Sequence, residues 1–514
     1  MQTWRFSRTL TTTALVWFLS ACSGSGGGSV PSPASMSTTV GGSPASSITP
    51  TPIPSQVDAR GHHGNPTPVP TEGPTGGPSP TPTPSETPVP APSVIGVQAG
   101  SSNAFVNFIG VNTHYFDGGS AYDTPSAEAA LENLGVLHLR DQPGESSQDH
   151  HYLTLASFGI HLDMFWMGNY QTTRSPSTYA GSTIALSNFD SYEGENEQNV
   201  TCSGDGTWVS DVTALQSSLW SGMQSNGLST LPLIAPSFGN CGSWAQLISD
   251  ANAMGTGVAA YSTYGNAHAY AGQVPPEQGG YVASQSSNSG IPNSYQGIAS
   301  IETPGKPLVV TEAGYGSDTS GNDNGVGAVG QERYTLRELL NFWNQGAQKA
   351  YVYALLDDPS GGNWGLMTDS YVAKPAYTAL KNLISTLSDP GGAGFSPGQL
   401  NDTLGGTLTN VNNVLLEKSN GTFELILWQA VASVNAGDSP LTVAPQTVTL
   451  TFPSAPSSIG AQTFTNTGTL TPVTLAQSGS VTSVPVTDIP VIVRITPASS
   501  TDGVLIKRLP RDHR

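Results

Sequence analysis

Short apolar runs alternate with amphipathic stretches from about residue 98 to residue 390. Eight of the runs read as β-strands, at residues 108–112, 136–140, 162–166, a weaker run before 197, 231–235, 258–261, 307–311 and 350–355. Helical periodicity fills the intervals. After the seventh run, for example, Leu336, Leu339, Leu340 and Trp343 recur at i, i+3, i+4 and i+7. Eight βα units in a segment of this length predict an α/β protein, a (β/α)8 TIM barrel. The competing arrangement, an open doubly wound sheet, is weakened because no G-x-G-x-x-G turn follows the first strand.

Beyond residue 393 the helical period disappears. Strand-like runs at 414–416, 423–428, 448–452 and 491–495 follow one another with turn residues between them. This spacing is typical of an all-β sandwich. We therefore expect a barrel over residues 98–392, a C-terminal β-sandwich over 393–500 and a short tail over 501–514.

The N-terminus has the pattern of an export signal. Arg5 and Arg8 precede an apolar run at 14–19 that is too short to span a bilayer, and Leu19-Ser20-Ala21-Cys22 follows it. This ending resembles the lipobox of bacterial lipoproteins, which implies a signal peptide over 1–22 and a lipid anchor on Cys22. The alternative is an ordinary signal peptide cut nearby, with Cys22 incidental. Either interpretation exports the protein, and the lipoprotein interpretation tethers it to a membrane at the cell surface.

Residues 23–97 contain 17 of the chain's 40 prolines among Ser, Thr and Gly. Such a composition predicts a disordered linker, because it cannot bury enough apolar surface to fold. Two cysteines remain after Cys22, and in an exported chain we expect Cys202 and Cys241 to form a disulfide. The formal net charge of −19 argues against nucleic acid as a partner, since phosphate binding needs a basic surface. Only 10% of the residues are charged, so the surface must be polar through Ser, Thr, Asn, Gln and Gly.

Two predicted strands end in glutamates. Glu193, Glu195 and Glu197 close the fourth strand, and Glu312 closes the seventh. Barrel active sites form where strands run out into βα loops, so these carboxylates are the first candidates for chemistry. Strand alternation puts 193, 195 and 197 on one face, and therefore leaves three candidates for the acid at this strand end.

The dipeptide Asn196-Glu197 after strand four, with Glu312 closing strand seven, resembles the large clan A of retaining (β/α)8-barrel glycoside hydrolases. The likeness covers residues 105–390, and a trailing β-sandwich also occurs in that clan. It implies that Glu197 is the acid/base, that Glu312 is the nucleophile, and that Asn196 binds the sugar 2-hydroxyl. Retaining hydrolysis needs two carboxylates roughly 5–5.5 Å apart, with different pKa values.

The same resemblance suggests supporting roles. His268 or Tyr270 would hydrogen-bond the nucleophile, and Arg140 would lie beneath it and keep it ionised. Other candidates for substrate contact are Asn112 and His114 at the first strand end, and the aromatic platforms Trp166 and Trp364; Tyr170 and Phe238 are weaker platforms. Asp357, Asp358, Asp318 and Asp323 could line the pocket, but none has a calcium-loop spacing, and we expect no metal.

The sequence thus predicts an exported glycoside hydrolase that needs no diffusible cofactor and acts on a β-linked oligo- or polysaccharide. A non-catalytic carbohydrate-binding or cell-surface lipoprotein on the same fold is the alternative. A structural adhesin using the sandwich domain is a third, weaker class.

Overall fold

The computed structural model describes residues 96–144, 146–166, 188–201, 207–239, 243–280, 294–319, 325–359, 362–435 and 438–498. The predicted signal peptide with Cys22, the linker up to residue 95, both Cys202 and Cys241, and the tail from residue 501 lie outside the described residues. The expected lipid anchor and disulfide therefore stay predictions.

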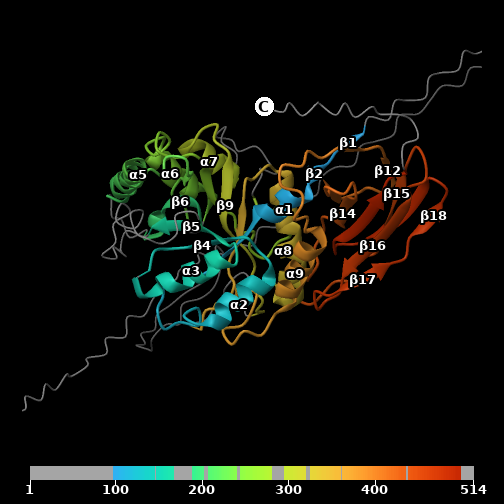
Figure 1. The fold of residues 1–514 in the computed structure, drawn as a ribbon, viewed down its shortest axis with the longest axis horizontal. Coiled ribbons are helices and arrows are strands. Elements are labelled where there is room, and N and C mark those ends of the chain that lie inside the picture. The colour runs from blue at the N-terminus through green and yellow to red at the C-terminus, as the bar shows by residue number, and fades with distance from the viewer. Residues whose placement is uncertain are drawn as a thin grey trace, which may run out of the picture. The chain divides into compact units, whose positions relative to one another are not determined.

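Eight parallel strands form a nearly closed barrel (Figure 1). They are β3 (Ile109–Asn112), β4 (His138–Asp141), β5 (His161–Trp166), β6 (Phe189–Glu195), β7 (Leu233–Ile234), β8 (Gly265–His268), β9 (Leu308–Ala313) and β10 (Ala350–Val352). Their order is β7-β6-β5-β4-β3-β10-β9-β8, and a parallel bridge from Ile234 to Tyr264 joins the two ends. The predicted TIM barrel is confirmed.

Helices lie between the strands and cover the barrel. They include α1 (Ser102–Phe108), α2 (Pro125–Leu134), α3 (Asp149–Ser157), α5 (Trp208–Ser225), α6 (Trp244–Met254), α7 (Tyr295–Glu302), α8 (Gly327–Asn344) and α9 (Pro375–Leu387). Helix α2 shows how local sequence sets these bounds. The Thr124 hydroxyl accepts from the backbone N–H of Ala127, Pro125 occupies the first turn, and Gly135 ends the helix at φ 84°.

The sixth strand is not where the sequence predicts it. Residues 256–261 form turns, and Val258 is apolar because it is fully buried in the core. The strand is instead β8, whose sequence Gly-Asn-Ala-His is short and polar. Its Asn266 and His268 side chains belong to the polar centre of the barrel, which is why no apolar run marks this strand.

The C-terminal part is built of antiparallel sheets, as expected. One sheet has the order β12 (Thr403–Gly406), β15 (Gln446–Thr451), β19 (Val481–Val486), β18 (Ala476–Ser478). The other has the order β17 (Leu470–Val473), β16 (Ser458–Phe464), β20 (Val491–Thr496), β14 (Phe423–Gln429), β13 (Val411–Glu417), β2 (Gly100–Ser101). Strand β1 (Val97–Gln98) pairs with β11 (Gln399–Leu400). Residues on both sides of the barrel in sequence thus contribute strands to this region.

Helix α8 contacts the sandwich through buried charged side chains. Arg333 Nη1 lies 2.8 Å from an Asp488 carboxylate oxygen, and Arg337 donates to Glu277 and to the Val431 carbonyl. The indole N–H of Trp428 donates to Glu277 at 2.7 Å. These bonds give partners to the two arginines of a helix that is buried along most of its length.

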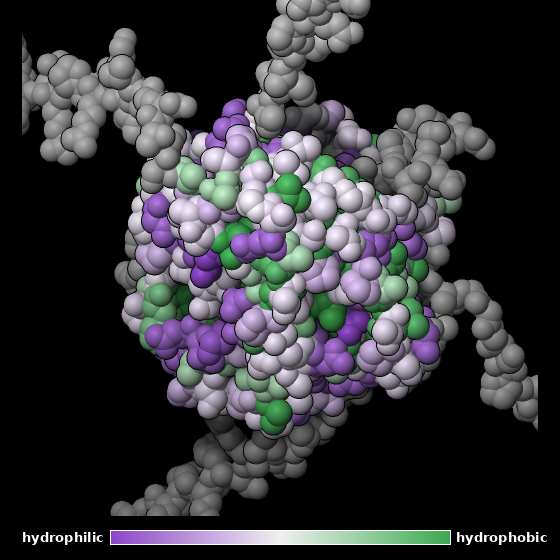
Figure 2. All heavy atoms as spheres, turned by 90° about the vertical axis from the view of Figure 1, so that its right-hand side faces the viewer, coloured by the Kyte–Doolittle hydropathy of each residue, from purple (hydrophilic) through white to green (hydrophobic). Residues whose placement is uncertain are grey.

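Figure 2 shows the face on the side of the sandwich, where pale residues of near-neutral hydropathy predominate and apolar side chains are scattered. This agrees with a surface that is polar through Ser, Thr and Gly. Among the described residues, no helix combines the length and apolar character needed to cross a membrane.

Candidate active site

A buried arginine organises the polar centre of the barrel. Arg140, near the end of β4, is 1% exposed and donates to four side chains. Its bonds reach Glu193 (2.6 and 2.8 Å), Glu312 (2.6 Å), Asn112 (3.0 Å) and Asn196 (2.8 Å). Its guanidinium also lies 4.0 Å from the ring centre of Phe165. One cation therefore holds together the ends of strands β3, β4, β6 and β9.

Glu312, the next-to-last residue of β9, is held by three neighbours. One oxygen accepts from Arg140, and the other accepts from the Tyr270 hydroxyl at 2.7 Å and lies 3.5 Å from His268 Nδ1. Burial raises the pKa of Glu312, but the positive charges of His268 and Arg140 and the hydrogen bond from Tyr270 outweigh it. The pKa of Glu312 is lowered, so this carboxylate stays ionised.

Glu197 follows β6 and adopts the left-handed backbone conformation, with φ 48°. Its backbone N–H donates to the Ser237 hydroxyl at 3.2 Å, and its carboxylate lies 2.5 Å from His268 Nδ1. Its side chain is 19% exposed, against 11% for Glu312. Burial lowers the pKa of His268, but Glu312 and Glu197 raise it more, and the pKa ends above its ordinary value.

The two glutamates face one another across His268. An oxygen of each and the imidazole nitrogen lie within 4.8 Å of one another. Such a close approach of their oxygens suits a pair that acts on one atom of a substrate from its two sides. The Nε2 atom of His268 is buried and has no hydrogen-bond partner among the described residues.

The rival glutamates behave differently from Glu197. Glu193 is fully buried and points into the barrel, where Arg140, Asn266 and Thr311 all contact it. Glu195 is the last residue of β6 and is 4% exposed. The expectation that 193, 195 and 197 share one face is wrong for Glu197, because the strand ends before it and its positive φ turns the chain away.

The two candidates after β3 have separate environments. Both ends of the Asn112 amide are used inside the barrel, by Arg140 and by the Thr311 carbonyl. His114 is partly buried among the rings of Tyr122 and Tyr353. Burial lowers the pKa of His114 to about 4, so its imidazole is neutral at ordinary pH.

The aromatic candidates also separate. Trp364 packs edge-on against Tyr270 with ring centres 5.2 Å apart, and so lies beside the nucleophile candidate. Trp166 instead stacks on Tyr192 at 5.6 Å and belongs to the hydrophobic core. Phe238 is likewise a core residue, and Tyr170 lies outside the described residues.

The aspartates after β10 take part in a local network. Asp357 accepts from the Lys374 ammonium at 2.5 Å and from the Gly365 backbone N–H. Asp318 accepts from the Asn363 amide at 3.4 Å, and Asp323 lies outside the described residues. These partners are protein groups that hold the loop together.

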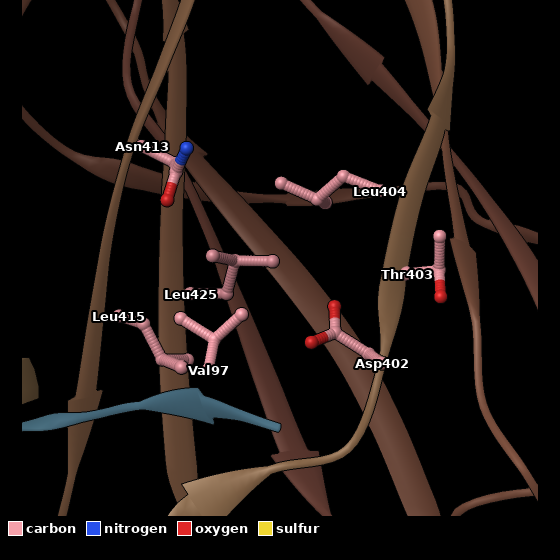
Figure 3. A pocket seen from close by; sticks show the side chains of 7 residues that line it. All are labelled: Val97, Asp402, Thr403, Leu404, Asn413, Leu415 and Leu425. Carbon is pink, nitrogen blue, oxygen red and sulfur yellow. The ribbon is translucent and has the colours of Figure 1, made fainter. Parts of the chain in front are cut away.

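A cavity of about 330 Å³ lies in the sandwich, away from these carboxylates in sequence and structure (Figure 3). Val97, Leu404, Leu415 and Leu425 supply apolar walls, and Asp402 is its single ionisable lining group. Burial raises the pKa of Asp402 to about 6. Its lining therefore offers one carboxyl group and lacks the pair of carboxylates found in the barrel.

Sequence reasoning missed three residues that complete the barrel centre. Asn266 donates to Glu193 and to the Ala235 carbonyl, Thr311 donates to the Asn266 amide oxygen at 2.6 Å, and Ser237 lies 3.4 Å from the Asn196 amide oxygen. Thr311 lies in the predicted strand 307–311, and Asn266 lies five residues after the predicted strand 258–261. A polar residue in or beside an apolar strand was the available signal. Ser237 carries no such signal.

No protein-family model matches the chain, and no curated protein sequence matches it significantly. Solved structures of similar fold include the catalytic domain of GH30 xylanase C from Talaromyces cellulolyticus, at 12% identity over 79% of this chain and 99% of that one, with TM-score 0.46. A glucosidase from Croceicoccus marinus is 8% identical over 79% of this chain and 98% of its own, with TM-score 0.49. A family 51 α-L-arabinofuranosidase from Bifidobacterium longum is 10% identical over 78% of this chain and 97% of its own, with TM-score 0.47. The barrel assignment itself comes from the strand order given above.

Proposed function

We propose that the protein is a retaining glycoside hydrolase that cleaves a β-linked oligo- or polysaccharide. The observation that carries the proposal is the pair Glu197 and Glu312, with carboxylate oxygens within 4.8 Å of one another at the carboxyl ends of a TIM barrel. Their unequal surroundings support a division of labour.

In this reaction the Glu312 carboxylate attacks the anomeric carbon. The bond from that carbon to the glycosidic oxygen breaks, and Glu197 gives its proton to the leaving oxygen. Water then attacks the glycosyl-enzyme, with Glu197 taking the proton and Glu312 released as carboxylate. The lowered pKa of Glu312 suits the nucleophile, since it must be ionised before attack.

Arg140 and Tyr270 are positioning residues for that attack, because both bind Glu312 oxygens. Asn196 has its amide oxygen engaged by Arg140, so its NH2 group is the part that can donate to a sugar hydroxyl. Neutral His114 and the indole of Trp364 supply a hydrogen-bonding group and an apolar ring edge on the same side of the barrel.

The test is sugar release from β-glucans, xylans, mannans, galactans and aryl β-glycosides by the wild type and by Glu312→Gln. Glu132→Gln, an exposed glutamate on α2, is the matched control. Release by the wild type and the control that vanishes in Glu312→Gln supports the proposal. Binding without release in all three proteins favours the non-catalytic carbohydrate-binding alternative, and release that survives Glu312→Gln excludes Glu312 as nucleophile.

Azide can assign the two roles. A small anion replaces the missing carboxylate in Glu312→Gly and gives a glycosyl azide of inverted configuration. In Glu197→Ala with an activated aryl glycoside, azide attacks the glycosyl-enzyme and gives the azide of retained configuration. A retained azide from Glu312→Gly and an inverted azide from Glu197→Ala would instead make Glu197 the nucleophile and Glu312 the acid/base.

We also propose that the protein is exported and held at the bacterial cell surface by a lipid on Cys22. The sequence pattern Leu19-Ser20-Ala21-Cys22 supports it. Detergent-phase partitioning of the wild type that is lost in Cys22→Ser would agree, and partitioning into the aqueous phase by both would leave only an ordinary signal peptide.

A further inference from the structure

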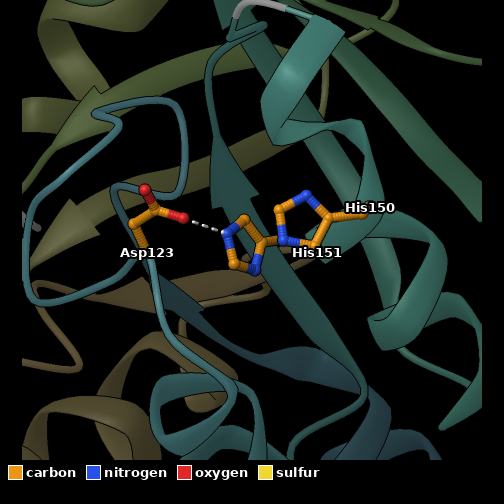
Figure 4. A group of neighbouring side chains, drawn as sticks. All are labelled: Asp123, His150 and His151. Carbon is orange, nitrogen blue, oxygen red and sulfur yellow. Dashed lines mark hydrogen bonds and ion pairs between the residues drawn. The ribbon is translucent and has the colours of Figure 1, made fainter.

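We propose that Asp123, His150 and His151 form a zinc site, with Glu128 orienting His151. The proposal does not depend on the proposed function. The residues come from the loop before α2, from α2 itself and from the first turn of α3. Figure 4 shows Asp123 and the His151 ring pointing toward one another, with the His150 ring beside that of His151. One donor atom of each of the three lies within 4.8 Å of the other two.

The hydrogen bonds around the cluster set the protonation of both rings. His150 Nδ1 lies 2.8 Å from the Ser147 carbonyl, which can only accept, so the proton is on Nδ1 and the lone pair on Nε2. His151 Nδ1 lies 2.7 Å from the Glu128 carboxylate, which places its proton in the same way. Both imidazoles therefore have a partner on Nδ1, as metal-binding histidines do, and present Nε2 as the ligand atom.

The third ligand is also held in place. One oxygen of Asp123 accepts from the Gly119 backbone N–H at 2.8 Å, and the other lies 2.9 Å from His151 Nε2. If His151 Nε2 bears a lone pair, this lone pair and the Asp123 carboxylate oxygen repel one another, because no proton lies between them. A cation between the two atoms removes this repulsion.

In this proposal a divalent cation takes the place of a second proton on His151. The His151 ring is 1% exposed and lies between the carboxylates of Asp123 and Glu128, and its centre is 3.9 Å from that of His150. A divalent cation would neutralise the two carboxylates and leave both rings neutral. Zinc bonds of about 2.0–2.1 Å put neighbouring tetrahedral ligands about 3.3 Å apart. The 2.9 Å pair would therefore open by a few tenths of an ångström, and the His150 donor, which lies within 4.8 Å of both, would settle at the same spacing.

The ligand set selects the metal. Two imidazole nitrogens and one carboxylate suit zinc and disfavour calcium and magnesium, which prefer oxygen ligands. Because His150 is exposed, a water can complete the coordination. Through Glu128 and the two histidines, the ion would connect α2 with α3. It would lie near Tyr115, whose ring centre is 5.1 Å from that of His151. Tyr115 directly follows the active-site candidate His114. The site would therefore stabilise the first two βα units.

The test is calorimetric titration of ZnCl2 into the full-length protein, without a polyhistidine tag and after EDTA treatment, with thermal melting beside it. We expect one zinc per chain and a rise in melting temperature that calcium does not produce. His150→Gln, which alters an exposed side chain, should weaken zinc binding at least about tenfold, and Glu128→Gln by about 10–100-fold. His161→Gln, outside the cluster, is the matched control and should bind as the wild type does.

The second group of three donors, Glu197, His268 and Glu312, requires its own control. Glu312→Gln should bind zinc as the wild type does. The proposal is overturned if millimolar zinc gives neither heat nor a change in melting temperature. It is also overturned if His150→Gln binds like the wild type, or if Glu312→Gln abolishes binding.

Discussion

Replacing Arg140 by Met tests whether this one cation neutralises the buried carboxylates of the barrel. The substitution keeps an unbranched apolar stem and removes the charged guanidinium, leaving Glu193 fully buried and Glu312 nearly so. Removing one partner of a buried ion pair costs about 3–5 kcal/mol, because the other charge stays buried. We expect Arg140→Met to lower the free energy of unfolding by that amount at pH 7.

The assay is urea unfolding of the wild type, Arg140→Met, Glu193→Gln and the double variant. The double variant should lose less than the sum of the two single losses, with a coupling of about 0.5–3 kcal/mol, since Gln at 193 needs no counter-charge. Lys381→Met, an exposed lysine bound to Asn133, is the control and should change little.

The pH dependence follows from the same reasoning. Both carboxyls become charged in the unfolded chain above about pH 4.3, and without the arginine their buried charges lack this counter-ion, so the deficit of Arg140→Met should grow as the pH rises above that value. Strictly additive losses, or a deficit that does not change with pH, would refute the assignment of Arg140 as their shared counter-ion.

Three further predictions concern protonation. Tyr270→Phe removes a hydrogen bond to ionised Glu312 worth about 1.5–3 kcal/mol and should move the acid limb of kcat/KM up by about one to two pH units, whereas Tyr315→Phe should not. In the wild type the lowered pKa of Glu312 should put that limb below 4.5, and a limb at or above 4.5 would contradict this shift. Glu302 is fully buried with no partner for either carboxylate oxygen among the described residues, and burial raises its pKa well above 4.5. It holds its proton when folded, so Glu302 should contribute a fall in stability of about 1.4 kcal/mol per pH unit above its unfolded pKa. In urea unfolding, the pH profile of Glu302→Met should differ from the wild-type profile by that slope, and an identical profile would show that Glu302 does not contribute it.

The barrel could be predicted from sequence because its signals are local. Seven of the eight predicted strands are confirmed, six of them through clear apolar runs and β6 through a weaker signal. Caps and prolines such as Thr124, Pro125 and Pro375 mark helix starts. The eighth signal failed at β8, since a strand whose side chains form the polar centre of a site has no apolar run. The strand was predicted at 258–261, where the apolar Val258 lies in a buried turn.

The sequence by itself determined the fold class and which strand ends carry the glutamates, because chain order and hydrophobic period decide both. Only the tertiary structure decided what each glutamate does. Glu193 and Glu197 are four residues apart in sequence, yet one is enclosed with Arg140 and the other, after a turn at positive φ, meets His268 and Glu312. The physical reason is that burial and charge partners, which set protonation and reactivity, come from strands far apart in the chain that the closure of the barrel brings together.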